Sequence, residues 1–256
     1  MHAVILAAGR GSRLGERTRN LPKCLTPLAG RPLLHWQLEA LGAAGAGPVA
    51  VVRGYMAEKL AGPGYQTFDN PRWAETNMVL SLACAAPWLR AFPCLVAYSD
   101  ILYGPGAVTA LAAAPGDITL TYDRLWLQLW SERFQDPLAD AESFRLDAAG
   151  NLVEIGRRTS SLADIQGQYM GLLKFTPAGW ARVERELEAL PQERRDRLDM
   201  TSLLNRLLQA GTPIGTVPVQ GGWCEVDNPS DADLYERRLA GPGPWSHDWR
   251  GQGRRP

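Results

Sequence analysis

Hydrophobic residues along the chain form short runs that alternate with stretches of helical spacing. The short runs predict strands at residues 2–8, 48–53, 94–98, 117–122, 169–175 and 213–219. Apolar positions three or four residues apart predict helices that begin at Pro32, Thr76, Pro105 and Thr176, and a further helix over residues 201–209. Strands that alternate with helices predict an α/β fold, with a Rossmann-like, mostly parallel sheet flanked by helices.

The regular pattern loosens between residues 123 and 168. Aromatic and charged residues are mixed there, and two strand-like pieces flank a turn at residues 149–151. We therefore expect a small insertion or lid within one domain that spans residues 1–240. Residues 241–256 are rich in Gly, Pro and Arg, which predicts a flexible tail, although its tryptophans could dock on the domain.

Composition excludes several classes of protein. A chain of 256 residues with 45% hydrophobic residues can bury a large core. Lys+Arg and Asp+Glu are both 27, so no excess of positive charge indicates a nucleic-acid partner. The four cysteines are scattered, with no C-x-x-C pair, as expected of reduced thiols in the cytoplasm. Gly9 and Arg10 interrupt the first apolar run too early for a signal peptide, and no segment is long enough to span a membrane.

A glycine-rich loop follows directly on the first predicted strand. Gly9 and Gly11 would let backbone N–H groups approach phosphate oxygens. The loop is not a P-loop, because no Gly-Lys-Ser/Thr follows, and it lacks the third glycine of the dinucleotide fingerprint. Arg10, Arg13 and Lys23 add cations that could offset the charge of a triphosphate and of a phosphoryl-transfer transition state.

The loop at residues 6–13, followed by Leu21-Pro22-Lys23, resembles the signature of the nucleotidyltransferase family that activates sugar phosphates and phosphocholine. Residues 76–81 and 98–101, and the short length, are most similar to phosphocholine and aminoethylphosphonate cytidylyltransferases, and the likeness spans residues 1–239. The resemblance implies a glycosyltransferase-A-like nucleotidyltransferase fold, with CTP as donor, Mg²⁺ as cofactor and Lys23 and Arg13 as catalytic residues. The nucleotide-binding residues expected are Leu6, Ala7, Ala8, Gly9, Arg10, Gly11, Ser12, Arg13, Lys23, Asn77 and Ser81.

Two aspartates follow predicted strands. Asp100 comes after residues 94–98, at the carboxyl edge of a parallel sheet, and Asp227 follows the final strand. Carboxylates from separate strand ends suit Mg²⁺, and the resemblance assigns both residues to the metal. The alternatives are a helix cap for Asp227 and a turn for Asp100; we favour the metal role. An acceptor phosphate is already anionic, so its attack needs alignment more than a general base.

The middle segment has aromatic and charged residues where the resembling family builds part of its acceptor site. The acceptor-binding residues expected are Arg133, Asp140, Glu142, Gln168 and Tyr169. Aromatic rings beside carboxylates can hold an ammonium group, as in phosphocholine, phosphoethanolamine or aminoethylphosphonate. Gln168 stands where related enzymes often carry glutamate, which leaves acceptors with an amide, carboxylate or hydroxyl open as well. Trp126 and Trp130 could instead anchor the insertion to the core.

Other interpretations remain for the helix at residues 77–81 and for the whole chain. Asn77 and Ser81 share a helix face that could turn toward the nucleotide, or they could simply cap and pack. A sugar-1-phosphate nucleotidyltransferase using UTP, dTTP or GTP is the enzymatic alternative, against which stands the short part after Gly222. A silent nucleotide-binding regulatory module would be expected to lose the cations or carboxylates that are kept here. The expected partners are CTP and a small phosphorylated or phosphonate acceptor, without nucleic acid or membrane, and a homodimer is left open.

Overall fold

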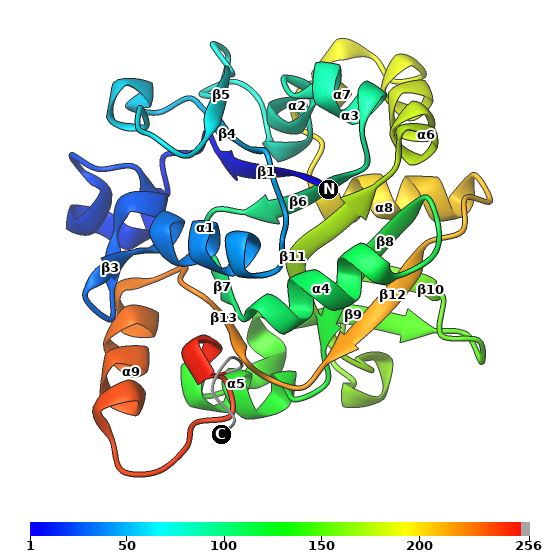
Figure 1. Ribbon diagram of the computed structural model, residues 1–256. Coiled ribbons are helices and arrows are strands. Elements are labelled where there is room, and N and C mark those ends of the chain that lie inside the picture. The colour runs from blue at the N-terminus through cyan, green and yellow to red at the C-terminus, as the bar shows by residue number, and fades with distance from the viewer. Residues whose placement is uncertain (252–256) are drawn as a thin grey trace.

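The computed structural model describes residues 1–251, which form a seven-stranded sheet with helices on both faces (Figure 1). The strand order is β12-β8-β11-β6-β1-β4-β5. The strands are β1 (His2–Ala7), β4 (Val49–Arg53), β5 (Gln66–Asp69), β6 (Cys94–Tyr98), β8 (Ile118–Asp123), β11 (Gln168–Phe175) and β12 (Gly215–Val219). Only β11 runs antiparallel to its neighbours, β6 and β8. The predicted mostly parallel sheet is confirmed, and the edge strand β5 is an addition to it.

Side chains of the central strand, β1, point alternately to the two faces of the sheet, and each face carries a hydrophobic cluster. In β1, Ala3, Ile5 and Ala7 face one hydrophobic cluster, and Val4 and Leu6 face another. The helices that supply the first cluster are α1 (Leu33–Ala43), α4 (Pro105–Ala113), α5 (Trp126–Arg133) and α9 (Pro229–Ala240). The helices that supply the second are α2 (Met78–Ala83), α3 (Ala86–Ala91), α6 (Pro177–Glu188) and α8 (Met200–Gln209), with the short α7 (Gln192–Asp196) beside α2. The sheet is therefore buried on both faces.

The helix predicted to begin at Thr76 is two helices. Asn77, rather than Thr76, is the residue that caps α2, and the chain turns at residues 84–85 before α3 begins. Pro87 lies in the first turn of α3. A proline lacks the N–H that a continuous helix would need at that position, so the apolar pattern continues across a break in the helix.

Residues 123–168 contain a helix and a hairpin that lie together at one end of the sheet (Figure 1). The helix is α5 (Trp126–Arg133), which packs on α9 (Pro229–Ala240). The hairpin pairs β9 (Glu142–Leu146) with β10 (Leu152–Arg158), and β10 packs on α8. The two strand-like pieces predicted on either side of the turn at residues 149–151 are thus confirmed.

A short ribbon joins the two segments that carry the predicted metal carboxylates. β7 (Ile101–Tyr103) pairs antiparallel with β13 (Trp223–Glu225), so the strand predicted at 213–219 is not the last one. The Val226 N–H donates to the Asp100 carbonyl over 2.9 Å just beyond this pairing. A second ribbon, β2 (Pro27–Leu28) with β3 (Arg31–Pro32), precedes α1. The first ribbon places Asp100 and Asp227 side by side.

Residues 241–251, which belong to the predicted flexible tail, pack on the domain, in line with the docking that its tryptophans left open. Trp249 is 3% exposed and His247 is fully buried, with its Nε2 2.9 Å from Asp123 Oδ2 at the end of β8. The Gly222 N–H donates to the Ser246 carbonyl. Gly and Pro content indicates flexibility, but burial of the aromatic rings outweighs it here. Residues 252–256 of the predicted tail lie outside the described part of the chain.

No helix within residues 1–251 combines the length and the apolar character that a bilayer crossing needs. All four cysteines are free thiols, and burial raises the pKa of Cys24 to about 12.

Candidate active site

The glycine loop lies directly on the side chain of Lys23. Gly11 has φ +66°, and a Cβ at this position would stand 2.7 Å from the Lys23 Cβ. The Gly11 carbonyl accepts hydrogen bonds from the Leu14 N–H at 3.1 Å and from the Thr18 hydroxyl at 2.9 Å. Only glycine combines the left-handed backbone with room for the lysine stem, so the loop and Lys23 fix each other.

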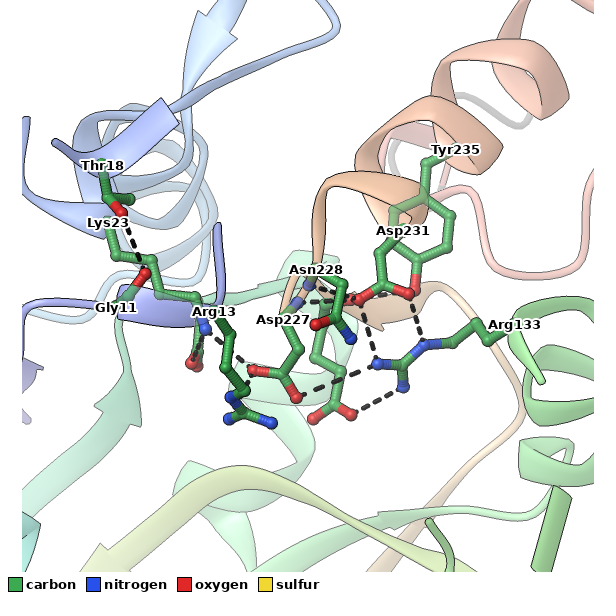
Figure 2. Close-up of polar contacts among 11 residues, drawn as sticks. Gly11, Arg13, Thr18, Lys23, Arg133, Asp227, Asn228, Asp231 and Tyr235 are labelled. Carbon is green, nitrogen blue, oxygen red and sulfur yellow. Dashed lines mark hydrogen bonds and ion pairs between the residues drawn. The ribbon is translucent and has the colours of Figure 1, made fainter. Parts of the chain in front are cut away.

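Lys23 bridges the two predicted metal carboxylates. Its Nζ lies 2.6 Å from Asp100 Oδ2 and 2.8 Å from Asp227 Oδ1, and the Arg13 guanidinium lies 2.9 Å from the same Asp227 oxygen (Figure 2). The Lys23 side chain is 9% exposed, whereas that of Arg13 is 65% exposed. Burial opposes the charge of Lys23, but the two carboxylates outweigh it and raise the pKa of the ammonium. Burial likewise opposes ionisation of Asp227, yet the surrounding cations lower its pKa.

Asp100 and Asp227 fit Mg²⁺. Their carboxylate oxygens converge on one point, which the Lys23 ammonium now neutralises. Mg²⁺ usually takes one or two protein carboxylates and completes its shell with water and substrate phosphates. Both side chains are partly exposed, 23% for Asp100 and 13% for Asp227, so phosphates can reach them.

A cavity of about 190 Å³ opens beside this cluster. Its lining residues are Leu6, Ala8, Gly9, Gly11, Lys23, Trp73, Thr76, Asn77, Met78, Ser81, Tyr98, Ser99 and Asp100. The structure thus brings most of the predicted nucleotide-binding residues together. The predicted residues outside this lining are Ala7, whose side chain packs in the core below the sheet, the exposed Arg10 and Ser12, and Arg13, which instead pairs with Asp227.

Asn77 and Ser81 line this cavity and also have structural partners. Asn77 accepts a hydrogen bond from the Met78 N–H at 2.7 Å and caps α2. The Ser81 hydroxyl accepts a hydrogen bond from the Asn70 side-chain amide at 3.0 Å. The capping alternative for Asn77 is therefore confirmed, and its contact with a nucleotide stays a prediction.

A second cavity, of about 360 Å³, adjoins the first and shares Met78 and Tyr98 with it. Its other lining residues are Trp130, Asp140, Glu142, Gly156, Gln168, Tyr169, Gly171, Asp199, Met200, Thr201, Ser202 and Glu225. Four carboxylates and no lysine or arginine of residues 1–251 line it. Burial raises the pKa of Glu142, and the nearby Asp199 and Asp140 raise it further. The second cavity therefore attracts a cation.

Aromatic residues complete the wall of this second cavity. Trp130 is 3% exposed, and its Nε1 has no hydrogen-bond partner within residues 1–251. The rings of Tyr98 and Tyr169 meet edge to face, with centroids 5.8 Å apart. Gly171 has φ +75° at an irregularity in β11, and a Cβ there would stand 2.8 Å from the Tyr98 ring. This bulge, at a point where β11 passes the site, makes room for Tyr98.

Arg133 differs from its predicted role, because its side chain is fully buried and lines neither cavity. The guanidinium lies 2.6 Å from Glu225 Oε1 and 3.0 Å from Asp231 Oδ1 (Figure 2). It also packs over the Trp130 ring, 4.8 Å from the ring centre. In this position it meets carboxylates of the protein rather than an acceptor. The other predicted acceptor residues, Asp140, Glu142, Gln168 and Tyr169, do line the second cavity.

Sequence reasoning missed two carboxylates of the second cavity. Asp199 accepts hydrogen bonds from the Ser202 N–H and hydroxyl at the start of α8, so its sequence signal is that of a helix cap. Glu225 ends β13, a strand too short for the pattern of residues to reveal. A carboxylate two positions before the predicted metal ligand Asp227 was the only available signal for Glu225.

Residues 3–157, more than half of the chain, match the model of a MobA-like NTP transferase domain. Together with the glycine loop, Lys23 and the paired aspartates, this match defines a nucleotidyltransferase. The chain belongs to the MobA-like NTP transferase family.

Several individual nucleotidyltransferases are similar to this chain in sequence or in fold. The CTP:phosphoglutamine cytidylyltransferase of Campylobacter jejuni is 32% identical over 250 residues, 91% of this chain and 98% of that protein. The CMP-5'-(3-aminopropyl)phosphonate synthase of Streptomyces rubellomurinus is 39% identical over 123 residues, 45% of this chain and 19% of that protein. A glucose-1-phosphate thymidylyltransferase is also similar in sequence. The inositol-1-phosphate CTP transferase of T. maritima shares the fold, with a TM-score of 0.69, 19% identity and coverage of 94% and 96%.

Proposed function

We propose that the protein transfers CMP from CTP to a small phosphate- or phosphonate-bearing acceptor that also carries a protonated amine, with release of pyrophosphate. The observation that carries the proposal is the second cavity, which is lined by four carboxylates. It adjoins the first cavity, and we call the first the nucleotide cavity and the second the acceptor cavity. An ammonium group bound there offsets their mutual repulsion, and the aromatic walls add cation–π attraction. CTP as donor rests on the cytidylyltransferase relatives.

The residues divide the work of the reaction between them. Lys23 and Arg13 neutralise the triphosphate and the leaving pyrophosphate. Asp100 and Asp227 would hold Mg²⁺, which when bound offsets phosphate charge and orients the reactants. An acceptor oxygen forms the new bond to the α-phosphorus as the bond to pyrophosphate breaks. Because that oxygen is already anionic, no general base is required of the protein.

The proposed preference for an amine bears on Gln168, which, from the sequence alone, left the chemical class of the acceptor open. A glutamine at this position removes one negative charge relative to the glutamate of many related enzymes. Arg133 balances the charge of Glu225, but Asp199 supplies a carboxylate from another element, beside Asp140 and Glu142, so the cavity keeps its anionic character. Glutamine and 3-aminopropylphosphonate, which give two relatives their names, both contain an amine.

The test is pyrophosphate release with Mg²⁺ from each nucleoside triphosphate, paired with acceptors that differ in one group. Phosphoethanolamine, phosphocholine, 2-aminoethylphosphonate, 3-aminopropylphosphonate and phosphoglutamine carry nitrogen groups, and 2-hydroxyethylphosphonate is the matched neutral control. Release with CTP and an amine-bearing acceptor, but not with the hydroxyl control, is the expected result. Release only with UTP, dTTP or GTP and a sugar 1-phosphate would establish the alternative instead. The cytoplasmic location and a homodimer stay predictions.

A further inference from the structure

We infer that Arg133 is a positioning residue that ties Asp227, the proposed metal ligand beside the nucleotide cavity, to the carboxylate wall of the acceptor cavity. It touches neither substrate. This inference rests on the proposed function for the identity of the two cavities. Its basis in the structure is the set of contacts around one buried guanidinium, drawn in Figure 2.

The first contact reaches the acceptor cavity. Arg133 Nη1 donates to Glu225 Oε1 over 2.6 Å, and Glu225 lines that cavity with a side chain that is 22% exposed. The guanidinium also lies 4.8 Å from the centre of the Trp130 ring, another wall of the same cavity. Arg133 therefore contacts two lining residues of the acceptor cavity, Glu225 and Trp130, while its own side chain is fully buried.

The second contact reaches the metal-binding carboxylate through one intermediate. Arg133 Nε and Nη2 form a fork on Asp231, at 3.0 Å to Oδ1 and 3.2 Å to Oδ2. Asp231 Oδ2 in turn accepts the N–H groups of Asp227 and Asn228, each at 2.9 Å. The Asp227 backbone is thereby fixed by a residue whose own orientation is set by the arginine fork.

The third relation is electrostatic. Arg133 Nη2 lies 3.9 Å from Asp227 Oδ2, on the side of that carboxylate opposite to Lys23 and Arg13 in Figure 2. Asp227 thus has cations on two sides, and its carboxylate plane is held between them. Loss of Arg133 would leave Glu225, Asp227 and Asp231 close together with less compensation, and their repulsion would move both the metal ligand and the acceptor wall.

The arrangement requires the planar fork of arginine rather than a positive charge alone. One guanidinium serves two carboxylates through three N–H groups in fixed directions, which a lysine ammonium cannot reproduce. Arg133→Lys keeps the charge and much of the stem. It is the variant best suited to separate positioning from neutralisation, and it is more certain to fold than a neutral replacement.

A second variant, Asp231→Asn, disturbs the contact between Arg133 and Asp231. In Asp231→Asn, the amide oxygen can still accept the N–H groups of Asp227 and Asn228, so the cap of α9 is kept. The amide nitrogen would then face Arg133 Nε, and two donors cannot bond to each other. This variant leaves Glu225 with its arginine partner, so it separates the metal side of the link from the acceptor side. Arg206→Lys, in an ion pair with Glu186 between α8 and α6, is the matched control.

The experiment measures Mn²⁺ binding to the enzyme with CTP by electron paramagnetic resonance, without acceptor, together with the KM for the acceptor and kcat. For Arg133→Lys we expect the Mn²⁺ concentration at half-saturation and the acceptor KM each to rise by about tenfold, as loss of a residue behind a metal ligand commonly does. Asp231→Asn should raise the Mn²⁺ value by a similar factor and the acceptor KM by less. Arg206→Lys should leave both unchanged, with all variants folded by circular dichroism.

Other outcomes overturn the inference. If Arg133→Lys changes the acceptor KM alone, Arg133 acts on the acceptor and not on the metal ligand. If both variants match the wild type in Mn²⁺ binding, the contact chain has no positioning role. Should the wild type show no turnover with any acceptor, the proposed function fails, while the Mn²⁺ comparison still decides whether Arg133 positions Asp227.

Discussion

Gly11→Ala tests the contact between the glycine loop and Lys23. The added Cβ would stand 2.7 Å from the Lys23 Cβ, 2.9 Å from its Cδ and 3.0 Å from its Cγ. The Cβ of a lysine cannot move without the backbone, so the side chain or the loop must shift. Lys23 Nζ now lies within 2.8 Å of both Asp100 and Asp227, and a shift of the stem disturbs both ion pairs.

Gly11→Ala is expected to lower both stability and catalysis, by different amounts. An alanine in the left-handed region costs about 1–2 kcal/mol. For a chain of this size, that loss lowers the melting temperature by about 2–8 °C. A displacement of Lys23, the proposed catalytic lysine, by about 1 Å should lower kcat/KM by roughly 100-fold. The catalytic loss should therefore far exceed what partial unfolding at the assay temperature explains.

A nearby glycine outside the loop is the matched control for this prediction. Gly15 also has positive φ, +56°, but a Cβ there meets nothing within 4 Å, so Gly15→Ala has the strain without the collision. Thermal unfolding and steady-state kinetics are measured for both alanine variants. If Gly11→Ala and Gly15→Ala have the same kcat/KM, the collision with Lys23 is not what matters, and the reasoning is refuted.

Three further predictions concern charge. Lys23→Met should bind Mn²⁺ alone about fivefold more tightly by electron paramagnetic resonance, because a competing unit charge worth at least ~1 kcal/mol is gone. Its kcat should still fall by about 100-fold or more; unchanged Mn²⁺ binding would contradict competition at the carboxylates. Because the pKa of Glu142 is raised, its carboxyl becomes neutral as the pH falls toward that pKa. The KM for an amine-bearing acceptor should therefore rise as the pH falls. In Glu142→Gln this rise should be smaller than in the wild type. His247→Ala leaves Oδ2 of the buried Asp123 without its partner and should cost about 3 kcal/mol of stability in chemical denaturation, whereas a loss near zero would show that the C-terminal segment is not anchored there.

The sequence predicted the elements whose pattern is long and regular. β6 has the predicted bounds, Cys94–Tyr98, and α6 begins directly after Thr176, the predicted start of that helix. Periodicity does not encode strand direction, so the antiparallel β11 could not be distinguished from its parallel neighbours. The edge strand β5 is partly exposed along its length and lacks the apolar run of a buried strand.

The candidate site was predicted where residues act within one local motif and less well where they act across elements. The loop and Lys23 are close in sequence, and they lie together in the structure. Arg133 at the end of a helix reads as a solvent-facing charge or a ligand contact, because its burial depends on Asp231, far away in the chain. The same holds for the C-terminal segment, whose anchoring depends on Asp123 meeting His247.

Phosphorus NMR of a reaction of the enzyme with CTP, Mg²⁺ and 3-aminopropylphosphonate or phosphoglutamine tests the central claim most directly, with 2-hydroxyethylphosphonate and glucose 1-phosphate run in parallel. We predict new signals of an anhydride between CMP and the amine-bearing acceptor, together with pyrophosphate, and none with either control. An adduct with glucose 1-phosphate, but with no amine-bearing acceptor, would contradict the account.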